Sequence, residues 1–129
     1  METMNEREIL VHEYVYVRAW DGGIVLGFEC EAEKPLAVGR KLGEIDENAC
    51  MNGYNWDALL SYYLSEHAPD ILECMESDPE AGSYVAYFED TPENERKARR
   101  FAEMILALVE GEEILCRLVR ERGDEIEWD

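Results

Sequence analysis

The feature that most constrains the fold of this chain is the alternation of apolar side chains on either side of Asp21-Gly22-Gly23. Residues 9–20 are rich in β-branched and aromatic side chains, and residues 24–31 form a second run with apolar side chains at every other position. Two such runs around a short glycine-containing turn are typical of a β-hairpin. The sequence therefore predicts two antiparallel strands near the N-terminus.

The alternation also predicts which side chains of the hairpin share a face. A two-residue turn at Gly22-Gly23 gives the pairs Asp21 with Ile24, Ala19 with Leu26, Val17 with Phe28 and Val15 with Cys30. A three-residue loop would place the apolar sets of the two strands on opposite faces. We therefore expect one apolar face, made of Val11, Val15, Val17, Ala19, Ile24, Leu26, Phe28 and Cys30. The other, amphipathic face carries Tyr14, Tyr16, Arg18, Trp20, Val25, Glu29 and Glu31.

After residue 55 the apolar side chains follow the period of an α-helix. A helix is predicted from Trp56 to His67 with Asn55 as its N-cap, and its apolar stripe continues to about residue 76. Residues 83–88 read as a third strand. Thr91-Pro92-Glu93 starts another helix with Thr91 as N-cap, and Gly111 separates it from a shorter helix that ends at Gly123. Residues 32–55 give no clear pattern beyond a short helix near 35–48.

These elements predict one α+β domain over residues 1–129. Its small antiparallel sheet consists of the N-terminal hairpin plus a third strand, with helices packed on one face. A chain of 129 residues buries enough surface to fold without disulfides or metals. The cysteines Cys30, Cys50, Cys74 and Cys116 form no Cys-x-x-Cys pair. An even count allows two disulfides, but nothing in the sequence indicates secretion, so we expect buried free thiols.

The net charge narrows the choice of partners. Twelve Lys and Arg against 31 Asp and Glu leave 12 − 31 = −19. Phosphate backbones and anionic membranes would repel such a chain, whereas a basic protein would attract it. Acidity can also serve solubility alone. No apolar run is long enough to span a membrane, and residues 1–6 lack the pattern of a signal peptide, so we expect a cytoplasmic protein.

Motifs of catalysis and metal binding are weak in this sequence. Neither His12 nor His67 has a His or Cys three or four residues away, and His67 is expected to pack in the core, so no metal and no cofactor are predicted. Neither Gly-x-Ser-x-Gly nor a P-loop occurs. Paired carboxylates are abundant, which leaves a small carboxylate-based hydrolase as the least favoured alternative. The sequence predicts a protein that is not an enzyme.

Two motifs resemble those of the immunity protein 51 family. The first is Asn52-Gly53-Tyr54-Asn55-Trp56 before a helix, and the second is Asp78-Pro79-Glu80-Ala81-Gly82, which precedes Tyr87 in the third strand. The resemblance implies a protein encoded beside a polymorphic or contact-dependent bacterial toxin, which it inhibits by binding. We expect most of these motif residues to be structural, with Gly53 and Gly82 at positive φ and Trp56 holding the helix to the sheet.

The sequence thus favours a cytoplasmic immunity protein that binds a cognate toxin domain, a basic nuclease, and blocks its access to substrate. The alternative from another class is an acidic regulatory or adaptor protein that binds a different basic protein. For either partner, the candidate binding residues are acids on expected exposed turns and on the tail: Asp78, Glu80, Glu89, Asp90, Asp124, Glu125 and Glu127.

Overall fold

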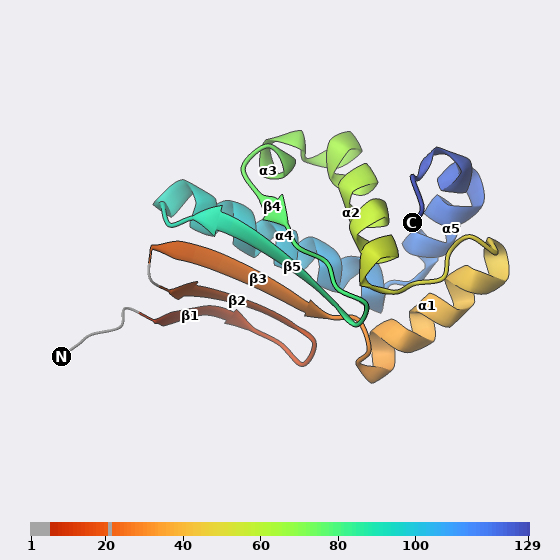
Figure 1. The fold of residues 1–129 in the computed structure, drawn as a ribbon, viewed down its shortest axis with the longest axis horizontal. Helices are drawn as coiled ribbons and strands as arrows, with labels where there is room; N and C mark the ends of the chain where they lie inside the picture. Colours follow the sequence, from red (N-terminus) through yellow and green to blue (C-terminus); the bar gives the residue numbers. More distant parts are fainter. Residues whose placement is uncertain (1–5, 21) are drawn as a thin grey trace.

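A five-stranded antiparallel sheet with the strand order β1-β2-β3-β5-β4 organises the fold (Figure 1). The computed structural model describes residues 6–20 and 22–129. The strands are β1 (Arg7–Val11), β2 (Val15–Trp20), β3 (Gly23–Glu29), β4 (Glu76–Ser77) and β5 (Ser83–Glu89). The helices are α1 (Glu33–Ile45), α2 (Gly53–His67), α3 (Pro69–Leu72), α4 (Pro92–Glu110), α5 (Glu113–Arg122) and the short 3-10 helix η1 (Gly123–Glu125). The α+β class is confirmed.

The predicted apolar face of the hairpin is the one that the helices cover. Val15, Val17 and Ala19 of β2 and Ile24, Leu26 and Phe28 of β3 are fully buried, whereas the residues between them are more exposed, apart from Gly27. Helix α4 contacts β1, β2, β3 and β5, and α2 contacts β5. Figure 1 shows α4 crossing behind the strands, with α2, α1 and α5 gathered at one end of the sheet.

The predicted register of the hairpin is wrong by two residues. Val17 lies opposite Leu26 and Val15 opposite Phe28, and the last pair before the turn is Trp20 with Gly23. Gly22 therefore lies in the turn, and Asp21, which was predicted to pair with Ile24, lies outside the described residues. Gly22 has φ +82°, which suits glycine in a tight hairpin turn. Because side chains alternate with a period of two, a shift of two residues leaves both faces unchanged.

The single strand predicted over residues 9–20 is in fact two strands. The chain turns at His12–Tyr14, where His12 N–H donates to the carbonyl of Val15, and β1 returns along β2. Tyr14 is therefore buried rather than on the amphipathic face, and its hydroxyl donates to Glu110 of α4. Val11 pairs with Tyr16 and lies on the uncovered face, not on the apolar face as predicted.

The helices agree with the sequence except at the start of α2 and in the unreadable segment. Thr91 caps α4 through its hydroxyl, as predicted, and the six apolar residues of that helix's stripe are buried. The N-cap of α2 is Asn52, however, whose side chain accepts from the N–H of Asn55 at 2.9 Å. Residues 33–45 form α1, which packs on α4 and α5.

The burial of four side chains differs from the prediction. Cys30 is buried, but Cys74 and Cys116 are only partly buried and Cys50 is exposed; all four are free thiols. His67 is exposed instead of packed in the core, and its ring lies 4.3 Å from that of Tyr63. Ala68 and Ile71, which follow it in the chain, are buried in the core instead.

Candidate functional site

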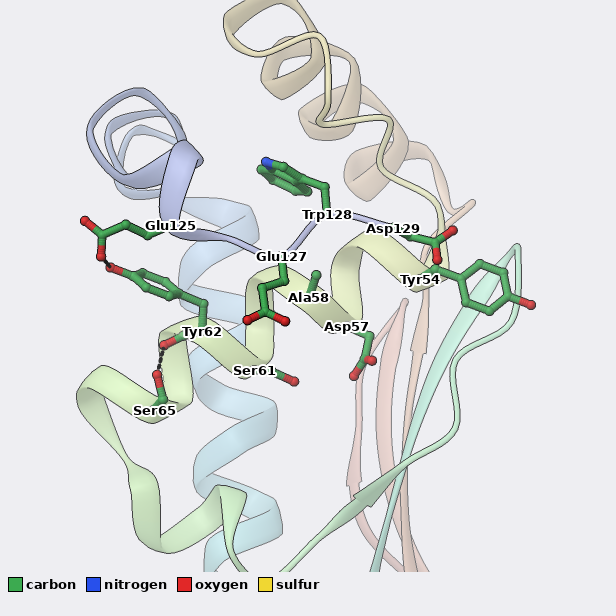
Figure 2. A pocket seen from close by; sticks show the side chains of 10 residues that line it. All are labelled: Tyr54, Asp57, Ala58, Ser61, Tyr62, Ser65, Glu125, Glu127, Trp128 and Asp129. Carbon is green, nitrogen blue, oxygen red and sulfur yellow. Dashed lines mark hydrogen bonds between the residues drawn. The ribbon is translucent and has the colours of Figure 1, made fainter.

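A cleft of about 610 Å3 lies between α2 and the C-terminal segment (Figure 2). One wall is the exposed side of α2, and the other is the chain after α5. The residues that line it are Tyr54, Asp57, Ala58, Ser61, Tyr62, Ser65, Glu125, Glu127, Trp128 and Asp129. The two walls are at least 60 residues apart in sequence, so the cleft is created by the fold.

The buried side chain of Asn55 holds the two walls of the cleft together. Its amide nitrogen donates to the carbonyl of Cys50 at 2.6 Å, and its amide oxygen accepts from the N–H of Asp129 at 2.7 Å. The indole N–H of Trp128 donates to the carbonyl of Gly123 at 3.0 Å, and Ile126 is buried. The C-terminal segment is therefore packed against the domain, and its acids have defined positions.

The lining of the cleft is acidic and aromatic. It contains the carboxylates of Asp57, Glu125, Glu127 and Asp129, and none of its described residues is Lys or Arg. Figure 2 shows the side chains of Glu127, Ser61 and Asp57 directed to the same side of α2. Carboxylates beside aromatic rings are the groups that hold Arg and Lys side chains in proteins, through charge-assisted hydrogen bonds and cation–π contacts.

The four carboxylates of the cleft differ in how far they are already satisfied. Glu125 accepts from the hydroxyl of Tyr62 at 3.1 Å and pairs with Arg122 at 3.2 Å. Partial burial, followed by this hydrogen bond, raises the pKa of Tyr62 above its usual value. Asp57, Glu127 and Asp129 form no ion pair with another described residue. Glu127 and Asp129 are exposed and so available to a cation from outside, whereas Asp57 is partly buried and its Oδ1 is shielded from solvent.

The motif glycine at the start of α2 allows a close backbone approach. A Cβ on Gly53 would lie 1.7 Å from the carbonyl oxygen of Glu80 and 2.3 Å from that of Ser83. Gly53 N–H donates to the carbonyl of Ala81 at 2.9 Å, which joins α2 to the turn between β4 and β5. The expected positive φ is wrong for Gly53 and Gly82, since the described glycine with positive φ is Gly22.

The other motif residues divide between the core and the surface. Trp56 is fully buried, and its ring meets that of Phe28 edge-on at 4.9 Å, so it does hold α2 to the sheet. A Cβ on Gly82 would lie 2.9 Å from the carboxylate of Glu31. Tyr54 and Tyr87, in contrast, are 42% and 45% exposed. Tyr54 lines the cleft, and Tyr87 lies on the uncovered face of the sheet.

The family model described as immunity protein 51 matches residues 23–124, which is most of the chain. This chain belongs to the immunity protein 51 family. No curated protein and no solved structure matches the sequence. As a member of this family it is an immunity protein against a toxin, and immunity proteins generally act by binding rather than by catalysis.

Two further observations describe this immunity protein. Within residues 6–20 and 22–129, no helix has the length and apolar composition needed to cross a membrane. In the same part of the chain, no three His, Cys, Asp or Glu side chains come together as metal ligands would.

The family match does not cover the whole chain. It leaves out β1 and β2, and it leaves out the residues after 124, which include most of one cleft wall.

The seven acids predicted as binding residues of the immunity protein are all exposed, but they form three separate groups. Asp124, Glu125 and Glu127 follow α5, and the last two line the cleft. Asp78 and Glu80 lie in the turn that touches the start of α2. Glu89 and Asp90 lie at the far end of β5, which for a strand of this length is roughly 20 Å from that turn.

The cleft also contains two acids that the sequence analysis missed. Asp57 was overlooked because it lies within a helix rather than in a turn, and Asp129 because its place depends on Asn55. One signal could have found Asp57. Residues 42–95 contain no Lys or Arg at all, so every acid of α2 lacks a basic neighbour along the chain.

Proposed function

We propose that this immunity protein neutralises a basic nuclease toxin domain in the cytoplasm by occupying its substrate-binding surface. The observation that carries the proposal is the cleft, where three carboxylates without ion-pair partners stand beside aromatic rings in a lining that has no Lys or Arg among its described residues. A nuclease binds its substrate through cations that contact phosphates. Carboxylates held in a fixed arrangement can take those cations instead.

The charge of the whole chain supports the same partner. Among the described residues, ion pairs involve six carboxylates, those of Asp70, Asp90, Glu93, Glu95, Glu112 and Glu125. The chain has 31 acids, so most of its negative charge remains uncompensated within the molecule. The alternative partner is a different basic protein, bound by this chain as an adaptor. Family membership favours a toxin over that partner, because immunity is the family's role.

The test uses the toxin domain encoded in the reading frame next to this gene, purified as an active protein and as a catalytically inactive variant. We expect the immunity protein to bind the inactive variant and to stop DNA or RNA degradation by the active one at equimolar concentration. Absence of binding, or a bound toxin whose activity is not directed at nucleic acid, would refute the nuclease proposal.

A matched pair of variants tests the cleft. Asp57→Asn, Glu127→Gln and Asp129→Asn together change the net charge from −19 to −16, as do Glu44→Gln, Glu47→Gln and Glu103→Gln at exposed positions elsewhere. We expect the first set to weaken toxin binding clearly more than the second. Equal effects of the two sets would mean that the cleft has no special part in binding.

A further inference from the structure

The face of the sheet that the helices leave uncovered has the composition of a protein-binding surface. We call it the open face. Its central side chains come from four strands and are mainly aromatic and aliphatic: Val11, Tyr16, Arg18, Trp20, Val25, Val85 and Tyr87. Val11 is 62% exposed, Trp20 49% and Tyr87 45%. Exposed apolar surface that is contiguous in this way marks interaction sites in soluble proteins.

The register of the strands places these side chains side by side. One row across the sheet runs Val11, Tyr16, Gly27 and Val85, and the next runs Glu8, Arg18, Val25, Tyr87 and Glu76. The ring of Tyr16 packs over Gly27, since a Cβ there would come within 2.2 Å of it. The guanidinium of Arg18 lies 4.7 Å from the centre of the same ring. The centre of the face is therefore packed and preformed.

Acids surround this centre on every side. Glu8 on β1 and Glu76 on β4 lie at the two edges of the sheet, because they pair with Arg18 and Tyr87. Glu29 and Glu89 lie at the two ends of β3 and β5 on the same face. All four are exposed. An aromatic centre inside a charged rim is the arrangement found in specific protein interfaces, where buried aromatics supply most of the binding energy.

We propose that the toxin domain docks on the open face, with Trp20 and Tyr87 as the anchoring side chains and the acidic rim contacting basic residues of the toxin. The inference rests on the proposed function and adds to it the surface that sets the lifetime of the complex. Charge complementarity selects this occupant, because a second copy of a chain with net charge −19 would bring two acidic rims together.

The limits of the family match support this assignment. The match begins at residue 23, so β1 and β2, which contribute Val11, Tyr16, Arg18 and Trp20, lie before it. A surface that fits one particular toxin has to differ between immunity proteins with different toxins. Such differences are free to occur in β1 and β2, which include the anchor Trp20, whereas Tyr87 lies inside the matched range and belongs to the shared part of the surface.

The kinetic test uses the inactive toxin domain encoded beside this gene and compares Trp20→Ala and Tyr87→Ala with Ile114→Ala. Ile114 is 50% exposed on α5, away from the sheet, and so is a matched control for an exposed apolar side chain. We expect each open-face variant to dissociate from the toxin about 30-fold faster or more, and the control to change by less than about threefold. Denaturant unfolding of each variant shows whether the fold is intact.

Footprinting with hydroxyl radicals on the same complex locates the contact without any substitution. We expect toxin binding to protect Trp20 and Tyr87 from oxidation, whatever happens at Tyr54, Tyr62 and Trp128 of the cleft. Protection confined to the cleft residues, or wild-type dissociation rates for both open-face variants, would overturn this inference while leaving the proposed function standing. Failure of the wild-type protein to bind any form of the toxin would overturn the proposed function instead.

Discussion

At Gly53 the backbone of α2 touches the turn between β4 and β5 so closely that no side chain fits between them. Because the atoms that a Cβ would meet are backbone carbonyl oxygens, neither side can move without displacing a whole element. We expect Gly53→Ala to lower the free energy of unfolding by about 1–3 kcal/mol or more, measured by chemical denaturation.

Gly43 is the matched control for this substitution. It lies near the end of α1, and a Cβ there would meet the carbonyl oxygen of Ala49 at an ordinary contact distance of 3.4 Å. Gly43→Ala should therefore stabilise the protein by about 0.5–1 kcal/mol, because alanine loses less backbone entropy in a helix. Equal effects of the two substitutions would mean that the close approach at Gly53 is absent.

The four thiols should differ sharply in reactivity. Burial, and after it the negative charges of Glu29 and Glu31, raises the pKa of Cys30 to about 12, whereas Cys50 is exposed. The thiolate is the reactive form, so Cys30 stays protonated and unreactive at about pH 8. We expect an aromatic disulfide reagent to modify Cys50 first and Cys30 only after unfolding. Rapid modification of Cys30 in the native protein would contradict its burial.

Among the elements, the β2–β3 hairpin shows what periodicity can and cannot predict. Alternation identified the buried face because the period of two is a local property of the chain. It could not identify the register, since a shift of two residues preserves both faces and only the turn conformation at Gly22 distinguishes them. The turn at His12–Tyr14 contains neither Gly nor Pro, so β1 and β2 read as a single strand.

The candidate site was less accessible to sequence reasoning than the fold. Exposed acids in turns could be named, and two of the seven line the cleft. The residues that lie beside these two acids could not be predicted, because the cleft depends on the hydrogen bond between Asn55 and Asp129, which are 74 residues apart. The sequence predicts an amphipathic open face, but β1 and β4 complete its acidic rim, and neither was predicted as a separate strand.

The assignment of the two sheet faces can be checked on β3. Phe28 is fully buried against Trp56, and Phe28→Ala should cost about 3–5 kcal/mol through the cavity it leaves. Val25, on the open face of the same strand, is only partly buried, so Val25→Ala should cost less than about 1 kcal/mol. Chemical denaturation measures both. The reverse order of the two values would mean that the faces are exchanged.

For the whole molecule, the distribution of charge matters more than its total. Residues 42–95 include α2, β4 and β5 and contain no Lys or Arg, so one continuous part of the chain supplies acid to both the cleft and the rim of the open face. The electrostatic field of these acids acts over a Debye length, about 10 Å at 0.1 M salt, and so reaches an approaching protein before any contact forms. The acids and the aromatic anchors should therefore control different steps of binding.

Stopped-flow association with the inactive toxin domain separates these steps. Between about 20 mM and 500 mM salt we expect the association rate to fall by about tenfold or more, because ions screen the attraction, while the dissociation rate changes little. Neutralising Glu125 and Glu127, or Asp78 and Glu80, should slow association and change the free energy of unfolding by less than about 1 kcal/mol, since all four acids are exposed and the ion pair of Glu125 with Arg122 lies at the surface. Trp20→Ala should instead speed dissociation. An association rate that does not change across this range would mean that the acidity of the chain serves solubility only. The aromatic centre of the open face would then have to select the partner without electrostatic attraction.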